Sequence, residues 1–163
     1  MSAFEIIGGT PLYGSIRLGG AKNASYKLMI AGLLAQSESR LLNFSHISDV
    51  ELTRNVIQSL GGSVHQRGER TLFIDPLTLH SAKISDEFGA ASRAASIFIP
   101  VLLHRFKHAR VPMPGGDKLG TLPLDRHFEA LQSMGAKINY EGESIVATCE
   151  QFKGTHYKFS KNS

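Results

Sequence analysis

Apolar residues recur along this 163-residue chain at two spacings, one helical and one strand-like, and the two alternate. Helical spacing predicts a helix that opens within residues 19–24 and further helices over residues 50–60, 88–106 and 123–134. Strand-like alternation between turn residues predicts strands at residues 4–7, 15–18, 40–44, 63–66, 71–74, 109–113, 137–140 and 144–149. In the first helix, the predicted buried side chains are Leu28, Ile30, Ala31, Leu33 and Leu34.

Glycine and proline mark where these elements end or bend. Gly61 and Gly135 follow the second and fourth helices, where a left-handed residue typically closes the last turn. Pro100 lies inside the predicted third helix, and it predicts a kink there because proline cannot donate the helical hydrogen bond. The short turns at residues 67–69 and 141–142 predict two hairpins.

The order strand, helix, strand, helix, hairpin occurs twice, and residues repeat with it. The sequence QSLGGSV at residues 58–64 is answered by QSMGAKI at residues 132–138, an offset of 74, whereas LLA at 33–35 is answered by LLH at 102–104, an offset of 69. The second copy therefore carries an insertion, which falls in the loop before its second helix. We predict an α/β fold of repeated βαβαββ units, at about residues 19–80 and 81–150, with a third starting near residue 152 and a strand at 154–159.

The inserted loop is the sequence PMPGGDKLG at residues 112–120. Its prolines and glycines exclude a helix, and it directly precedes the predicted helix at residue 123. One interpretation is a surface turn with a solvated Asp117–Lys118 pair. The other is a functional loop, which an insertion into a repeated scaffold favours; Asp117 could then act as a general acid if its pKa were raised.

Composition narrows the class of protein. Hydrophobic residues make up 42% and charged residues 20%, which excludes a disordered chain. The net charge of +4 is scattered along the chain, so it suits a small anionic substrate and not a nucleic-acid track. The histidines are dispersed; His104 and His108 lie four residues apart, but the positive charges of Arg105 and Lys107 beside them oppose a metal cation. No dinucleotide fingerprint is present, so we expect neither metal nor cofactor.

Cysteine usage and hydropathy bear on the compartment. Cys149 is the single cysteine and lies in a predicted strand, which indicates a structural thiol and excludes a disulfide framework. No apolar run approaches the length of a membrane span, and the first residues lack the pattern of a signal peptide. We therefore expect a cytoplasmic protein without a membrane partner.

Two further positions could carry chemistry. Lys22 and Asn23 stand at the start of a helix led by Gly19 and Gly20, where backbone N–H groups and a lysine charge suit a phosphate or carboxylate. Arg93 has only small neighbours and could reach across a groove. A solvated lysine and a surface arginine are the alternatives at these positions.

The sequences GGAKNA at 19–24, PGGD at 114–117 and LDRH at 124–127 together resemble the UDP-N-acetylglucosamine 1-carboxyvinyltransferase (enolpyruvyl transferase) family, over residues 4–163. The resemblance implies two domains, each an inside-out α/β barrel of three such units, with the active site between them. It implies transfer of the enolpyruvyl group from phosphoenolpyruvate to the 3-hydroxyl of UDP-N-acetylglucosamine in peptidoglycan synthesis.

The resemblance also implies roles for particular residues. Lys22 would bind phosphoenolpyruvate, Asn23 would contact substrate, and Arg93 would touch the sugar nucleotide. Asp117 would donate a proton to the vinyl carbon, at a position where most members have Cys and some have Asp; this predicts resistance to fosfomycin, which inactivates the Cys enzymes through a thioether. The implied uridine- and nucleotide-binding positions are Pro123, Leu124, Asp125, Arg126, Lys161 and Ser163.

One departure from the family and one related enzyme leave alternatives open. Leu122 stands where the family has an arginine that contacts phosphoenolpyruvate, so a divergent, non-catalytic paralogue acting as a binding or regulatory module is one alternative. The shikimate-pathway enolpyruvyl transferase is another, although it has Ser where Asn23 stands. Family members are more than twice as long, so we predict an N-terminal fragment, inactive alone, whose residues 1–18 would pack on a missing C-terminal domain.

Overall fold

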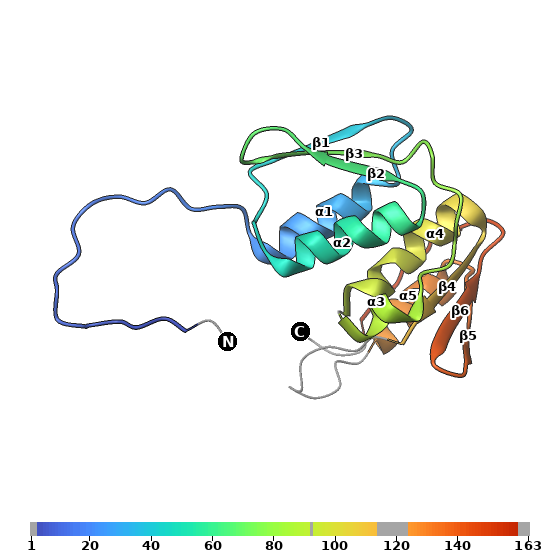
Figure 1. Cartoon of the computed structure of the whole chain (residues 1–163). Coiled ribbons are helices and arrows are strands. Elements are labelled where there is room, and N and C mark those ends of the chain that lie inside the picture. The colour runs from blue at the N-terminus through green and yellow to red at the C-terminus, as the bar shows by residue number, and fades with distance from the viewer. Residues whose placement is uncertain (1–2, 92, 114–123, 160–163) are drawn as a thin grey trace.

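The computed structural model describes residues 3–91, 93–113 and 124–159, and Figure 1 shows their arrangement. The elements of the first unit are α1 (Lys22–Gly32), β1 (Ser39–Leu42), α2 (Ser48–Ser59), β2 (Ser63–Gln66) and β3 (Thr71–Asp75). Those of the second unit are α3 (Asp86–Ala91), the 3-10 helix η1 (Arg93–Ile97), α4 (Phe98–Phe106), β4 (His108–Pro112), α5 (Asp125–Ser133), β5 (Lys137–Glu141) and β6 (Ser144–Thr148).

The two units have the same sheet topology. The first sheet has the strand order β1-β3-β2 and the second has the order β4-β6-β5, and every pair is antiparallel. In both, the last strand of the unit lies between the other two. The first sheet lies across α1 and α2 (Figure 1), and its alternate residues Val64, Leu72 and Ile74 are buried. The repeat predicted from the sequence is thus confirmed as a structural repeat.

The helix ends repeat as closely as the sheets do. After α2, Gly61 has φ +95°, and the N–H groups of Gly61 and Gly62 donate to the carbonyls of Gln58 (3.0 Å) and Ile57 (2.9 Å). After α5, Gly135 has φ +102° and the same pair of bonds forms one repeat later, with distances of 2.9 and 3.0 Å. This is the Schellman arrangement, which satisfies the last carbonyls of a helix. Both predicted glycine caps are confirmed.

One hydrophobic core runs through both units. The fully buried side chains of Met29, Leu33 and Ile57 from the first unit belong to the same cluster as Phe98 and Leu102 from α4. Apolar burial of this kind is the main favourable term in folding.

A polar clamp joins the two units at the end of α1. Arg105 Nε donates to the Leu33 carbonyl at 2.8 Å, and its Nη2 donates to the carbonyl of Ala35. These carbonyls lie at and after the C-terminal end of α1, where helical partners are missing. A side chain of the second unit therefore completes the hydrogen bonding of the first.

The helices depart from the prediction in two respects. The chain between residues 88 and 106 is not one helix kinked at Pro100: it is divided by η1, and Pro100 is the third residue of α4, where its missing N–H costs no helical bond. The buried face of α1 consists of Ser25, Met29 and Ile30, followed by Leu33, whereas the predicted Leu28 and Leu34 are exposed, as is Ala31. Two apolar stripes compete on this helix, and packing on α2 and α4 selects one of them.

The strands predicted at both ends of the chain are not formed. Residues 3–18 contain no helix or strand, and Phe4, Leu12 and Ile16 are almost fully exposed. Residues 154–159 are likewise outside any strand. A strand exists only where a neighbouring strand takes up its backbone hydrogen bonds, and in the described part of the chain neither segment has one. The packing of residues 1–18 on a further domain stays a prediction.

Candidate active site

The first turn of α1 is fixed against the loop that leads to α2. Gly20 lies so close to this loop that a Cβ at position 20 would be 1.8 Å from the Asn43 carbonyl oxygen. The buried Ser25 hydroxyl donates to the Ala21 carbonyl (3.0 Å) and accepts from the Ser45 N–H (2.8 Å). Glycine is therefore required for close approach, and α1 begins at a position that the loop determines.

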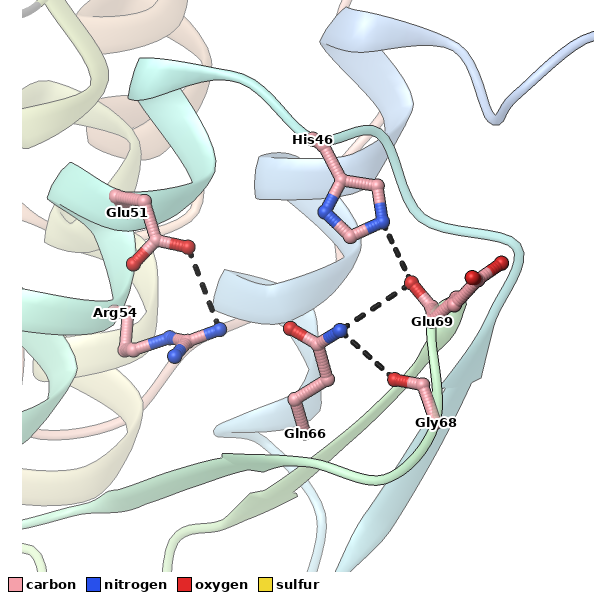
Figure 2. Close-up of polar contacts among 6 residues, drawn as sticks. All are labelled: His46, Glu51, Arg54, Gln66, Gly68 and Glu69. Atoms are coloured by element: carbon pink, nitrogen blue, oxygen red, sulfur yellow. Dashed lines mark hydrogen bonds and ion pairs between the residues drawn. The ribbon is translucent and has the colours of Figure 1, made fainter.

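The same loop is held from its other side by the β2–β3 hairpin. In Figure 2, His46 Nε2 donates to the Glu69 carbonyl at 2.6 Å, and Gln66 Nε2 donates to the Gly68 carbonyl at 2.8 Å. One turn along α2, Arg54 forms an ion pair with Glu51 at 3.4 Å. The His46–Glu69 contact thus joins the loop before α2 to the β2–β3 hairpin, while the other two contacts lie within the hairpin and within α2.

Lys22 and Asp49 meet where these two helices begin. Lys22 is the first residue of α1, Asp49 is the second residue of α2, and Lys22 Nζ lies 3.2 Å from Asp49 Oδ2. The Lys22 side chain is 62% exposed and that of Asp49 only 25%. The positive ends of two helix dipoles and an accessible ammonium therefore lie together, which is an arrangement suited to an anionic group.

Tyr26 completes this cluster one turn along α1. Partial burial raises the pKa of the Tyr26 hydroxyl, the charge of Asp49 raises it further, and the charge of Lys22 acts in the opposite direction. The tyrosine hydroxyl therefore stays a neutral hydrogen-bond donor at neutral pH. Sequence reasoning did not find Tyr26 or Asp49; the one local signal for Asp49 is an acidic residue in a first helical turn.

Four other predicted site residues are described: one lies on α1 and three lie at the start of α5. Asn23 is exposed, next to Lys22 on α1. Leu124 directly precedes α5 and packs against the core, and Asp125 and Arg126 form the first turn of α5, where Arg126 is half-buried. The structure thus places Leu124, Asp125 and Arg126 at the start of α5, and their role in uridine binding stays a prediction.

An open cavity of about 570 Å³ connects α1 with α5. Lys27 from α1 and Arg126 and His127 from α5 line it, together with the apolar side chains of Ile97 and Phe128. Lys22 and Asn23 lie on the turn of α1 that precedes Lys27. Among the described residues, Arg126 is therefore the one predicted site residue that lines this cavity, whereas Lys22 and Asn23 do not line it.

Several of the predicted site residues are not among those that the structure describes. Asp117, Pro123, Lys161 and Ser163 are not among the described residues, and of Arg93 only the backbone is described, as the first residue of η1. In the described ranges, no cluster of His, Cys, Asp or Glu has the composition of a metal site. No described helix is long and apolar enough to cross a membrane.

Curated proteins similar in sequence to this chain bear the name of one enzyme. The chain is 36% identical to UDP-N-acetylglucosamine 1-carboxyvinyltransferase 3 of Caldanaerobacter subterraneus over 98% of its own length, and 38% identical to UDP-N-acetylglucosamine 1-carboxyvinyltransferase of Mycobacterium leprae over 93%. It spans 38% of the first protein and 36% of the second. The chain therefore corresponds to little more than a third of the curated relatives that it matches.

Solved structures give the same fold. The enolpyruvyl transferase NikO from Streptomyces tendae aligns with a TM-score of 0.74 over 89% of this chain and 32% of that one, at 18% identity. EPSP synthase from Acinetobacter baumannii aligns with a TM-score of 0.62 over 92% of this chain and 35% of that one, at 19% identity. The profile of EPSP synthase (3-phosphoshikimate 1-carboxyvinyltransferase) matches residues 6–163. Because that profile covers nearly the whole sequence, the chain belongs to the EPSP synthase family.

Proposed function

We propose that the chain is part of an enolpyruvyl transferase that moves the enolpyruvyl group from phosphoenolpyruvate to the 3-hydroxyl of UDP-N-acetylglucosamine, in peptidoglycan synthesis. The observation that carries the proposal is the Lys22–Asp49 pair at the joined starts of α1 and α2. An anion with a phosphate and a carboxylate suits a lysine beside two positive helix ends. The relatives at 34–38% identity that bear this enzyme's name support the choice of reaction.

The proposed roles are divided among three segments. Lys22 holds phosphoenolpyruvate at the start of α1, and Asn23 beside it contacts the substrate. Asp117 donates the proton that the vinyl carbon takes up, which a carboxylic acid can do when its pKa is high enough. Leu124, Asp125 and Arg126, with Pro123, bind the uridine end, and Arg93, Lys161 and Ser163 add contacts to the sugar nucleotide.

The rest of the site comes from chain that the relatives have and this sequence does not. The 163 residues span 38% of the Caldanaerobacter relative, so we propose that a second domain completes the active site and that the chain alone does not turn over. Both proposed substrates are cytoplasmic metabolites, and the proposed location is the cytoplasm. We propose no cofactor and no nucleic-acid partner.

Two enzymes of this fold differ in the molecule that accepts the enolpyruvyl group. The matching profile and the Acinetobacter baumannii structure bear the name EPSP synthase, for which the acceptor would be 3-phosphoshikimate. Asn23 favours the sugar nucleotide, because the shikimate enzyme is expected to have Ser at that position. The test is phosphate release from phosphoenolpyruvate by the longest polypeptide that the reading frame encodes, with each acceptor in turn. Release with 3-phosphoshikimate alone would overturn the choice of acceptor.

The second alternative is a paralogue that binds substrate without turnover, and Leu122 motivates it. The family arginine at this position contacts phosphoenolpyruvate, and the loss of a charged partner at an anion site costs about 1.5–3 kcal/mol. We expect Leu122→Arg in the longest polypeptide to tighten phosphoenolpyruvate binding. Binding of both substrates without phosphate release, before and after this substitution, would favour the paralogue.

A further inference from the structure

The chain after β6 turns back and follows α5 from its end to its beginning. At the C-terminal end of α5, the Lys153 N–H donates to the Met134 carbonyl at 2.9 Å, and Phe152 packs against the core. Further on, the Tyr157 hydroxyl donates to Glu129 Oε2 at 2.6 Å. Phe159 then lies at the cavity that Arg126 and His127 also line. The segment therefore advances along α5 towards the turn that carries Arg126.

The Tyr157–Glu129 contact is the central point of this attachment. Tyr157 packs edge-on against Phe159, with ring centroids 5.1 Å apart and an interplanar angle of 80°. The hydrogen bond to Glu129 is the main cause of a raised pKa of Tyr157, while the charge of Arg126 acts against it. Arg126 and Glu129 are three residues apart and so share one face of α5. Tyr157, Glu129 and Arg126 thus form one group.

This group lies beside residues 124–126, a stretch to which uridine binding is assigned under the proposed function. Leu124 directly precedes α5 and Asp125 and Arg126 begin it, and Phe159 lines the same cavity as Arg126. We propose that Glu129 and Tyr157 are positioning residues for the sugar nucleotide: their hydrogen bond holds residues 157–159, which reach the cavity at Phe159, beside the end of α5 that carries Leu124, Asp125 and Arg126. The proposal rests on the proposed function.

The physical reason is pre-organisation. A segment outside helix and strand samples many conformations, and a ligand that contacts it must order it on binding. A hydrogen bond that orders the segment beforehand removes part of this cost. The effect is confined to the ligand that uses the segment, so it should fall on the nucleotide and not on phosphoenolpyruvate, whose proposed site is at the start of α1.

The experiment measures both Michaelis constants in the longest polypeptide of the reading frame. We expect Tyr157→Phe to raise KM for UDP-N-acetylglucosamine about three- to tenfold, the range of one net hydrogen bond, with KM for phosphoenolpyruvate unchanged. Glu129→Ala should do the same, and the double variant should be no worse than either single one. Glu129→Gln retains an acceptor oxygen and should restore most of the affinity.

A matched control removes a comparable contact elsewhere. Arg110 donates to Glu141 Oε2 at 2.7 Å on the exposed side of the second sheet, so Arg110→Ala should leave both constants unchanged. A wild-type protein without enolpyruvyl transfer would overturn the proposed function. A wild-type protein that transfers normally, with variants whose nucleotide KM does not move or whose two constants rise together, would overturn the positioning role alone.

Discussion

The ammonium of Lys22 and the carboxylate of Asp49 lie 3.2 Å apart and join the first turns of α1 and α2. The pair holds the lysine in place while leaving 62% of its side chain exposed. An exposed pair of this kind contributes only about 0–1 kcal/mol to stability. We therefore infer that the pair serves to orient the Lys22 ammonium at the N-terminal ends of α1 and α2, and contributes little to stability.

Lys22 should matter for ligand binding much more than for folding. We expect Lys22→Ala to change the free energy of unfolding by less than about 1 kcal/mol, because the side chain is largely solvated. The affinity of the Lys22→Ala variant for phosphoenolpyruvate should fall about tenfold or more, because one charge-assisted hydrogen bond to the ligand is lost. Lys83→Ala is the matched control, since it removes the same charge from an exposed position that does not line the cavity between α1 and α5. Equal losses in the two variants would refute a specific role for Lys22.

Gly20 should be intolerant of any side chain, and its neighbour Gly19 tolerant. A Cβ at position 20 would lie 1.8 Å from the Asn43 carbonyl oxygen, whereas at position 19 no atom lies within 4 Å. We expect Gly20→Ala to destabilise the fold by about 1–3 kcal/mol, since the backbone must move to admit the methyl group. Gly19→Ala should be close to neutral. Urea denaturation of the two variants checks this, and equal stabilities would contradict it.

Tyr26 should make stability fall at alkaline pH. Its pKa is raised above the ordinary value of 10.0 in the folded state, chiefly by burial and then by Asp49, so the folded protein holds this proton more tightly than the unfolded chain does. The stabilisation is therefore complete below pH 10.0 and is lost as the pH rises through the folded pKa. Chemical denaturation between about pH 9 and about pH 11 should show a shallower decline for Tyr26→Phe than for the wild type. Parallel declines would contradict the assignment.

Local signals in the sequence were sufficient for the repeated unit. Gly61 and Gly135 each follow an amphipathic helix and take positive φ, and the short turns at residues 67–69 and 141–142 close hairpins in both copies. Each of these features depends on a few neighbouring residues, which is why periodicity and turn chemistry predict them. The order of the strands then follows from the same connections in both units.

Features that depend on distant packing could not be predicted in this way. Helix α1 has two apolar stripes, and periodicity alone does not show that Met29 is buried while Leu28 is exposed. The partnership of Lys22 with Asp49 joins residues in two helices, and Tyr157 meets Glu129 across 28 positions. The strands expected at residues 4–7 and 15–18 require a neighbouring strand, and their own residues cannot supply it.

The proposed proton donor, Asp117, has a chemical consequence that can be tested directly. Fosfomycin inactivates the Cys members of the family by forming a thioether, and the carboxylate of Asp117 cannot form one. We expect the longest polypeptide of the reading frame to keep its activity during incubation with fosfomycin, and Asp117→Cys to lose activity progressively. Mass spectrometry of the inactivated variant should show the covalent adduct. Time-dependent inactivation of the wild type would contradict the prediction.

The two Schellman glycines offer a comparison within one chain, because they occupy equivalent positions of the repeat but have different surroundings. At Gly61, a Cβ would lie 2.0 Å from His80 Nδ1 and 2.7 Å from the Thr78 carbonyl oxygen, whereas at Gly135 the nearest atom is the Gln151 carbonyl oxygen at 3.5 Å.

Gly135→Ala should therefore cost only the left-handed backbone, about 1–2 kcal/mol. Gly61→Ala should cost more by about 1 kcal/mol or more, because the Thr78 backbone must also move. Urea denaturation of both variants measures the difference. A double variant Gly61→Ala with His80→Ala tells the two obstacles apart: the histidine ring is a side chain that can turn away, so its removal should recover little of the loss. If the two single variants are equally stable, backbone conformation alone sets the cost at both positions, and the tight approach of residues 78–80 to α2 has no energetic weight.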